Sequence, residues 1–287
     1  MGVVTHPTST YSTFQIKQFC EQRSSLTKSY STRIKLKVLS ENSHGESEVS
    51  LLGILLSSLY ISMLSVRWQK YLGAQKQLSI RQLASYTKAF FRPFFRLLNP
   101  ATRRIEKIKS LRILNITSSH LKLLREAIES DYDGILILED DAYFQSPDLL
   151  GSFLEKIIEF SAALPIRKHY IDLSESFSLI ELGAAHLVIT AESQKLVIEE
   201  SIFNIQKMSV PITNTVCAVF YSPEFVHVLE KEISKKLTKR FDKYIPIDWL
   251  INKILIELYN DNHRVTCYTT NPGIFRQQSL VRSATHE

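Results

Sequence analysis

Short apolar segments alternate with amphipathic ones along most of the chain. Residues 135–138 are a continuous apolar run, which is typical of a strand buried on both faces of a sheet. Residues 33–39 alternate strictly between apolar and basic positions, as a strand with one exposed face does. Residues 121–128 carry leucine and isoleucine at helical spacing. Strands that alternate with helices predict an α/β fold with a mainly parallel sheet flanked by helices.

The same patterns place further elements. Strands are expected at residues 3–4, 170–173, 185–190, 215–221 and 264–268, and helices at residues 191–201, from 223 and from 247. The pair Ser222-Pro223 indicates a helix start, because serine caps a helix and proline suits its first position. Ser118, Ser119 and His120 are expected to begin the helix that carries the leucines of residues 121–128.

Two helical segments are expected before residue 112. Residues 50–66 carry no charge over 17 residues, which is the lower limit of a membrane span. Their five serines and one glycine favour instead a helix buried within the protein. Residues 67–112 are also expected to be helical, with breaks at Pro93 and at Asn99-Pro100, since proline interrupts the helical hydrogen bonds.

The composition is that of a globular protein with a sizeable core. The chain has 287 residues, of which 44% are hydrophobic and 22% charged. No linker-like stretch divides it, so we predict one domain over residues 1–287 with a basic helical insertion at about residues 50–112. The three cysteines are too few and too far apart for a disulfide framework or a four-cysteine zinc site. These thiols, together with an N-terminus that lacks a signal-peptide pattern, predict a cytoplasmic protein.

The positive charge is concentrated in one stretch. Residues 67–112 hold twelve basic residues and one acid, Glu106, a net charge of +11, whereas the rest of the chain sums to −5. Such a stretch suits an anionic partner, whether membrane headgroups, a phosphorylated substrate or nucleic acid. No recognised nucleic-acid motif accompanies it, so nucleic acid is not expected as a partner.

Within this stretch, residues 88–98 interleave phenylalanine and leucine with Lys88, Arg92 and Arg96 around Pro93. Two interpretations stay open. In the first, the rings fill the core and the cations are merely solvated. In the second, the segment lies in a membrane interface, with its rings at headgroup depth and its cations against anionic lipid. The second interpretation predicts a protein that binds peripherally at the inner face of the membrane.

The apolar run ends on three acids, Glu139, Asp140 and Asp141. Side chains alternate faces along a strand, so Glu139 and Asp141 are expected on one face and Asp140 on the other. Three adjacent carboxylates repel one another, and a cation offsets this repulsion. Hard oxygen ligands without histidine or cysteine point to Mg²⁺ or Mn²⁺, which bridges to substrate phosphates. The alternative is a strand that ends in a solvated acidic turn.

Several of these segments resemble a known family. The stretch LILEDDA at residues 136–142, preceded by SSHLKLLREAI at residues 118–128, resembles the lipopolysaccharide-biosynthesis glycosyltransferases of family 25. Segments at 183–186, 246–249 and 272–279 match that family's pattern in the same order. The resemblance covers roughly residues 115–280 and implies a GT-A-like (Rossmann-like) fold. The first 110 residues depart from it, because they lack the family's usual opening strand that ends in Asp-Arg.

The resemblance implies a nucleotide-sugar donor, most simply a UDP-sugar, across the carboxyl ends of the first strands. Asp141, together with Glu139, would hold the metal, and Asp140 or Glu139 would reach the ribose or the donor sugar. Thr5 and His6, directly after the first strand, would lie beside the uridine.

The resemblance also implies roles for residues outside the acidic motif. His120 would contact the diphosphate, or would only cap its helix. Arg276 and Gln277 would close over the diphosphate. Asp248 would act as the general base of an inverting reaction, which must take the proton of the acceptor hydroxyl. The alternative for Asp248 is that it only caps the helix from 247.

These expectations combine into a metal-dependent, inverting glycosyltransferase. It would move a sugar from a nucleotide-sugar to a hydroxyl of a glycan or a lipid-linked acceptor in the synthesis of cell-envelope polysaccharide. Two alternatives remain: a metal-dependent phosphate-ester hydrolase that uses the same carboxylates, and a protein with a degenerate core that binds an anionic surface or nucleic acid.

Overall fold

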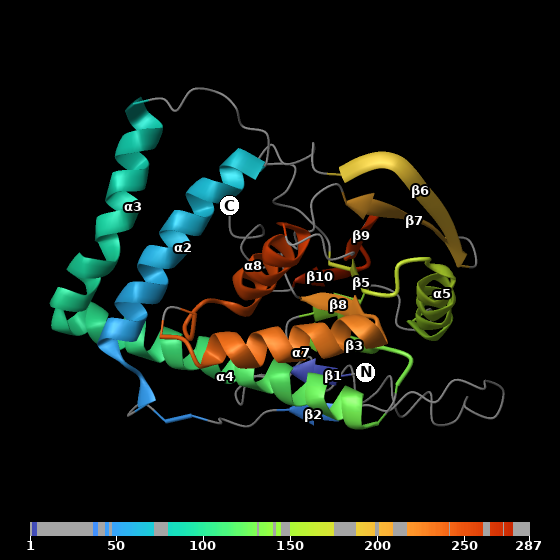
Figure 1. Cartoon of the computed structure of the whole chain (residues 1–287), viewed down its shortest axis with the longest axis horizontal. Coiled ribbons are helices and arrows are strands. Elements are labelled where there is room, and N and C mark those ends of the chain that lie inside the picture. Colours follow the sequence, from blue (N-terminus) through green and yellow to red (C-terminus); the bar gives the residue numbers. More distant parts are fainter. Residues whose placement is uncertain are drawn as a thin grey trace.

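The fold is seen in a computed structural model of the chain (Figure 1). The structure describes residues 2–4, 37–39, 44–45, 48–71, 80–130, 132–139, 142–144, 150–174, 188–198, 201–208, 217–240, 242–260, 265–271 and 273–277, in some of these ranges by the backbone alone. Within them, β-strands and α-helices follow one another along the chain, so the α/β class predicted from the sequence is confirmed.

Eight strands form one mixed sheet in the order β2-β1-β3-β8-β5-β9-β7-β6. Their bounds are β1 (Gly2–Val4), β2 (Lys37–Leu39), β3 (Ile135–Glu139), β5 (His169–Asp172), β6 (Val188–Ile198), β7 (Ser201–Met208), β8 (Ala218–Tyr221) and β9 (Thr266–Asn271). Strands β1, β2 and β3 are parallel, and so are β5 and β9. Strand β8 is antiparallel to both of its neighbours, β3 and β5.

The prediction of a mainly parallel sheet is therefore wrong. Strands β8 and β3 are both short apolar segments of the sequence. Apolar content alone does not determine the direction in which a buried strand runs. The helix predicted at residues 191–201 is also wrong, because most of that segment belongs to β6, which pairs antiparallel with β7. The β-branched residues Val197 and Ile198 favour a strand, and pairing with β7 provides hydrogen-bond partners for the backbone of β6.

Helices cover the two faces of the sheet. Their bounds are α2 (Leu51–Tyr71), α3 (Ile80–Leu98), α4 (Pro100–Glu129), α5 (Leu150–Ala163), α7 (Pro223–Leu237) and α8 (Ile247–Asn260). Helices α4, α7 and α8 pack on one face, and α5 packs on the other. Helices α2 and α3 stand beside the sheet, next to the first half of α4 (Figure 1). A separate small sheet pairs β4 (Ala142–Phe144) with β10 (Phe275–Gln277).

Alternation along the strands divides the core between the two faces. Ile135 and Ile137 of β3 are buried beneath α4, α7 and α8, while Leu136 and Leu138 are buried against α5. Strand β8 divides in the same way, with its odd-numbered residues on the first face. The central strands are thus buried on both sides, as their continuous apolar sequence indicated. Cys217 and Cys267 are buried, one in each of these two cores.

Two of the predicted helix boundaries change. Pro93 lies inside α3, whereas Asn99 and Pro100 do separate α3 from α4, with the Asn99 side chain accepting a hydrogen bond of 3.0 Å from Ala101 N. His120 was expected to begin a helix, but it lies within α4. The serines before it do not serve as caps, because Ser118 directs its hydroxyl to His44 in another part of the chain.

Helix α2 is held to the rest of the protein by polar contacts. The ammonium of Lys253 in α8 lies 2.5 Å from Asp242 and 4.0 Å from the ring centre of Tyr60 in α2. The backbone N–H of Ser50 donates to the hydroxyl of Tyr244 at 3.0 Å. The buried helix predicted from residues 50–66 is buried on one side only, since Leu52 is exposed. Among the helices that the structure describes, none is long and apolar enough to cross a membrane.

Gly134, directly before β3, provides a test of the sheet. Its φ of 149° is one that residues with a side chain rarely adopt. A Cβ there would lie 2.4 Å from Phe220 Cζ and 2.9 Å from the carbonyl oxygen of Tyr221. We expect Gly134→Ala to lower the free energy of unfolding by about 3 kcal/mol, from strain and a backbone clash together. Urea unfolding measures this change, and Asp133→Ala, at the exposed neighbouring position, is the control that should stay within about 0.5 kcal/mol of wild type.

Candidate functional site

The carboxyl ends of β1 and β3 lie side by side. The two strands are parallel, and Val4 of β1 pairs with Glu139, the last residue of β3. Strand β2 flanks β1 on its other side, so the chain leaves β1 towards one side of the sheet and leaves β3 towards the other. In open α/β sheets, ligands bind beyond the carboxyl ends of the strands at such a switch in strand order. The topology therefore places a candidate ligand site at this edge.

Two carboxylates lie at this edge on the same face of the sheet. Glu139 ends β3, and Asp172 ends β5, which is parallel to β3 because both are antiparallel to β8. Burial raises the pKa of the Tyr221 hydroxyl, and the charges of Asp172 and Glu139 raise it further. Asp172 is buried, and one of its oxygens accepts a hydrogen bond of 3.0 Å from Ser174 N.

Asp172 was not singled out from the sequence. The available signal was the one that identified Glu139, namely a carboxylate at the end of a short buried strand. This signal was weak for Asp172, because Asp172 is a single acid. Its position next to β8 also depends on the strand order, which the sequence does not give.

The path of the chain brings His120 to the same edge. Helix α4 runs back along the sheet before β3 begins, and it contacts both β1 and β3. From His120 to Glu129 the helix rises roughly 14 Å, and from Ile135 to Glu139 the strand rises roughly 13 Å. His120 therefore lies at about the level at which β3 ends.

The imidazole of His120 is held neutral. The side chain is buried, and burial lowers its pKa from 6.5 to about 4. Its Nε2 atom has no hydrogen-bond partner among the described residues. A neutral ring can donate or accept one hydrogen bond through this atom, so it can contact a ligand oxygen but does not bring a positive charge to a diphosphate at pH 7.

Asp248 lies in the first turn of α8, as predicted. Helix α8 ends shortly before β9, which is parallel to β5, so the helix begins towards the edge at which β3 and β5 end. Burial raises the pKa of the Asp248 carboxyl group, although backbone N–H groups of Trp249 and of Asp248 itself donate to it and lower that pKa. Asp248 therefore makes the contacts of a capping residue and also has the raised pKa that favours a base.

The remaining predicted residues can be placed only by the backbone or not at all. Gln277 of β10 pairs with Ala142, and Arg276 pairs with Tyr143, so β10 runs beside the strand that begins directly after the acidic motif. Four further residues predicted for the site lie outside the described residues: Thr5, His6, Asp140 and Asp141.

The donor set at this edge consists of hard oxygen atoms, which suits Mg²⁺ or Mn²⁺. Within the part of the chain that the structure describes, no three His, Cys, Asp or Glu side chains gather closely enough to hold a metal ion. Of the three adjacent acids, only Glu139 belongs to that part. The metal site thus stays a prediction, to which the structure adds Asp172 as a buried carboxylate on the same face.

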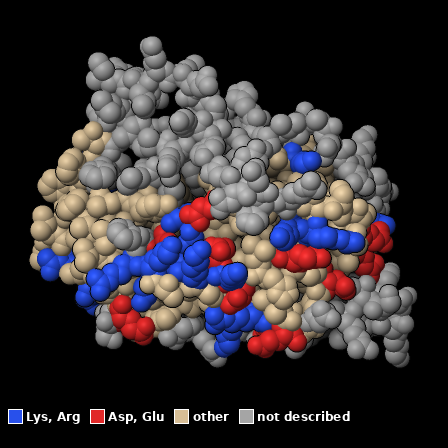
Figure 2. All heavy atoms as spheres, in the orientation of Figure 1, with Lys and Arg blue, Asp and Glu red and all other residues tan. Residues whose placement is uncertain are grey.

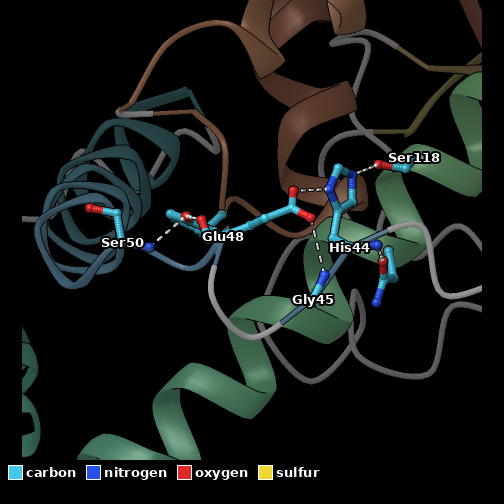
Figure 3. A network of polar contacts seen from close by, with 7 residues as sticks. His44, Gly45, Glu48, Ser50 and Ser118 are labelled. Carbon is cyan, nitrogen blue, oxygen red and sulfur yellow. Dashed lines mark hydrogen bonds and ion pairs between the residues drawn. The ribbon is translucent and has the colours of Figure 1, made fainter.

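A second polar cluster was not foreseen from the sequence. His44 Nδ1 lies 2.6 Å from Glu48 Oε2, and His44 Nε2 lies 2.9 Å from the hydroxyl of Ser118 in α4 (Figure 3). An ionised carboxylate only accepts, so in the neutral ring Nδ1 carries the proton and Nε2 accepts from Ser118. The hydrogen bond to His44 is the main cause that lowers the pKa of Glu48.

This order of serine, histidine and carboxylate is also that of a nucleophilic triad. Such a triad needs backbone N–H groups aimed at an oxyanion. The N–H of His44 instead donates to Asn115 Oδ1 at 3.0 Å, and that of Gly45 donates to Glu48 Oε1 at 3.2 Å. Since these donors are already engaged, we interpret the cluster as a clamp that holds the segment before α2 against α4.

Comparison with known proteins does not assign the chain to a family. No protein-family model matches the chain, and no curated protein matches it significantly.

The burial of His120 predicts a pH dependence of stability. Its pKa is about 4 when folded and 6.5 when exposed, so the unfolded chain binds more protons between these values. The free energy of unfolding should therefore fall as the pH drops from about 6.5 to 4. In His120→Leu this fall should be smaller by up to about 3 kcal/mol.

Urea unfolding at a series of pH values measures the difference. His169, which is also buried with a lowered pKa, keeps its own contribution in both proteins. His227→Leu, at an exposed position of α7, controls for the loss of any histidine. Equal pH dependence in wild type and His120→Leu would show that this ring is solvated.

Proposed function

We propose that the protein is a metal-dependent, inverting glycosyltransferase that uses a nucleotide-sugar donor, most simply a UDP-sugar, and a glycan or lipid-linked acceptor. The observation that carries the proposal is the pairing of Val4 with Glu139 at the switch in strand order. It supports a ligand site at the point where the acidic motif leaves the sheet. The resemblance to the family 25 enzymes supplies the reaction.

The residues around this edge suit the parts of such a donor. Asp141 and Glu139 are the proposed metal ligands, and a bound metal would offset the charge that develops on the departing diphosphate. Asp172 adds a carboxylate that can bind the metal or accept from a donor hydroxyl. His120, neutral at pH 7 and with its Nε2 unpartnered among the described residues, can donate a hydrogen bond to a phosphate oxygen.

Asp248 is the proposed base. A base works best when its pKa lies near the operating pH, and burial moves the pKa of this carboxyl group in that direction. Backbone N–H groups that donate to the Asp248 side chain hold it at the start of α8. These contacts suit both a base in a fixed position and a helix cap.

A GT-A-like arrangement is part of the proposal. It is supported by the parallel pairing of β1 with β3 at the switch in strand order, and by the acidic motif, which begins with the last residue of β3. It is also supported by the small sheet, which lays β10, with Arg276 and Gln277, beside β4 directly after that motif.

A donor screen tests the function. The protein is incubated with nucleotide-sugars with and without Mn²⁺, and the release of nucleoside diphosphate is measured. Thermal unfolding in the presence of UDP gives a second readout, since UDP at 100 times its Kd adds about 2.7 kcal/mol to the free energy of unfolding. Stabilisation by UDP that needs Mn²⁺ supports the transferase. Hydrolysis of simple phosphate esters without stabilisation by UDP would support the hydrolase instead.

Replacement of the metal ligand should remove activity and leave the fold intact. We expect Asp141→Ala to abolish transfer with little change in the free energy of unfolding, because it removes a carboxylate from a repulsive cluster. Asp141→Asn should be nearly as damaging, since an amide is a poorer ligand for a hard cation. The control is Asp133→Ala, an exposed acid at the other end of the same strand, which should keep wild-type turnover. Wild-type turnover of Asp141→Ala in a chelator would disprove the metal assignment.

Replacement of the base should lower turnover selectively. Asp248→Asn keeps the size and the capping ability of the side chain but accepts no proton at neutral pH. We expect turnover to fall by roughly 10²-fold or more, with donor binding little changed. Glu224→Gln is a matched control, because Glu224 is an exposed acid in the first turn of α7. A loss of stability that accounts for the loss of activity would assign Asp248 to capping alone.

A further inference from the structure

Helix α3 presents a stripe of large apolar side chains to solvent. The stripe consists of Phe91, Phe94, Phe95 and Leu98, which recur at the spacing of one helix face. Their side chains are 48%, 38%, 69% and 72% exposed, respectively. The interpretation that these rings fill the core is therefore wrong. A contiguous apolar surface of this kind marks an interaction site.

Two exposed isoleucines follow the turn into α4. Ile105 and Ile108, one helical turn apart, are 50% and 48% exposed. The turn between the two helices is held by Arg103 Nε, which donates to the carbonyl oxygen of Leu97 at 2.7 Å. It is also held by an ion pair of 2.6 Å between Arg96 and Glu106. These contacts hold the turn between α3 and α4 in place.

Cations border the apolar side chains on both helices. On α3, Lys88 and Arg92 are exposed and lie one turn apart beside the stripe. On α4, exposed cations lie one residue or one turn from Ile105 and Ile108, namely Arg104, Lys109 and Arg112. Glu106, the sole acid in residues 67–112, is neutralised by Arg96. Figure 2 shows residues that are neither acidic nor basic over the end of the molecule where Figure 1 places α3, with basic side chains at the border.

We propose that the α3 stripe, together with Ile105 and Ile108, docks the protein on an anionic lipid surface. The apolar side chains enter the boundary between headgroups and acyl chains, and the bordering cations bind the lipid phosphates. A second copy of the chain fits this surface poorly, because two such surfaces face to face would bring like charges together. The surface does not depend on the transferase assignment.

Sedimentation with vesicles tests the proposal on the full-length protein. We expect binding to vesicles of phosphatidylcholine with 30% phosphatidylglycerol, and at least tenfold weaker binding to pure phosphatidylcholine. Raising the salt from 0.1 M to 0.5 M should weaken the binding several-fold, because exposed charges are screened. Phe91→Ser with Phe95→Ser, both at exposed positions, should reduce it at least tenfold while leaving the thermal unfolding midpoint unchanged.

Charge reversal tests whether vesicle binding depends on the cations that border the stripe or only on the net charge of the protein. Lys88→Glu with Arg92→Glu leaves the Arg96–Glu106 ion pair intact and should also reduce binding at least tenfold. The control, Lys231→Glu with Lys239→Glu, reverses two exposed cations of α7 and of the segment that follows it, and should bind nearly as wild type. Equal binding by the two charge variants, or binding that ignores lipid charge, would overturn the proposal. So would dimerisation without vesicles that Phe91→Ser with Phe95→Ser abolishes.

Discussion

The candidate site depends on one constraint, the common direction of β1, β3, β5 and β9. Because these strands end at one edge, a helix on the α4 face that leads directly into one of them has to run back from that edge. Helix α4 runs back before β3, and α8 runs back before β9. The middle of α4 and the first turn of α8 are therefore brought towards the ends of β3 and β5. A slip of β3 by one residue would move Glu139 to the opposite face and would separate it from Asp172.

Burial shifts the pKa values of Asp248 and His120 in opposite directions. It raises the pKa of Asp248 and lowers that of His120, because a charged form of either group loses solvation. The two groups are thus pushed towards their neutral forms. Shifted pKa values cluster at functional sites, which agrees with the roles proposed for Asp248 and His120.

The parts of the fold that could be predicted from sequence are those set by local chemistry. The apolar run before Glu139 formed the expected strand, and Asn99-Pro100 and Ser222-Pro223 marked helix starts because proline geometry is local. The Asn99 side chain caps its helix, whereas the expected serine cap is not made, because the Ser222 hydroxyl donates to the carbonyl oxygen of Arg167. The direction of β8 was not predictable, since it depends on which strands it joins. His120 looked like a helix start because Ser118 is a capping residue, yet that hydroxyl binds His44, 74 residues away along the chain. Asp172 was missed for the same reason, because its neighbours are set by strand order.

The two halves of α4 connect the proposed docking surface with the proposed site. From Ser110 onwards the helix is increasingly buried against the sheet and α7, whereas Ile105 and Ile108 in its first turns are exposed. A continuous helix keeps its residues at a fixed separation because its hydrogen-bonded backbone resists bending. From Ile108 to His120 the helix rises roughly 18 Å. The His44–Glu48–Ser118 clamp and the contact of Lys253 with the ring of Tyr60 hold α2 against the same core. If α3 and the first turns of α4 lie on a lipid surface, the carboxyl edge of the sheet is therefore held at a fixed distance from that surface. Such an arrangement suits an acceptor sugar that is itself carried on a lipid.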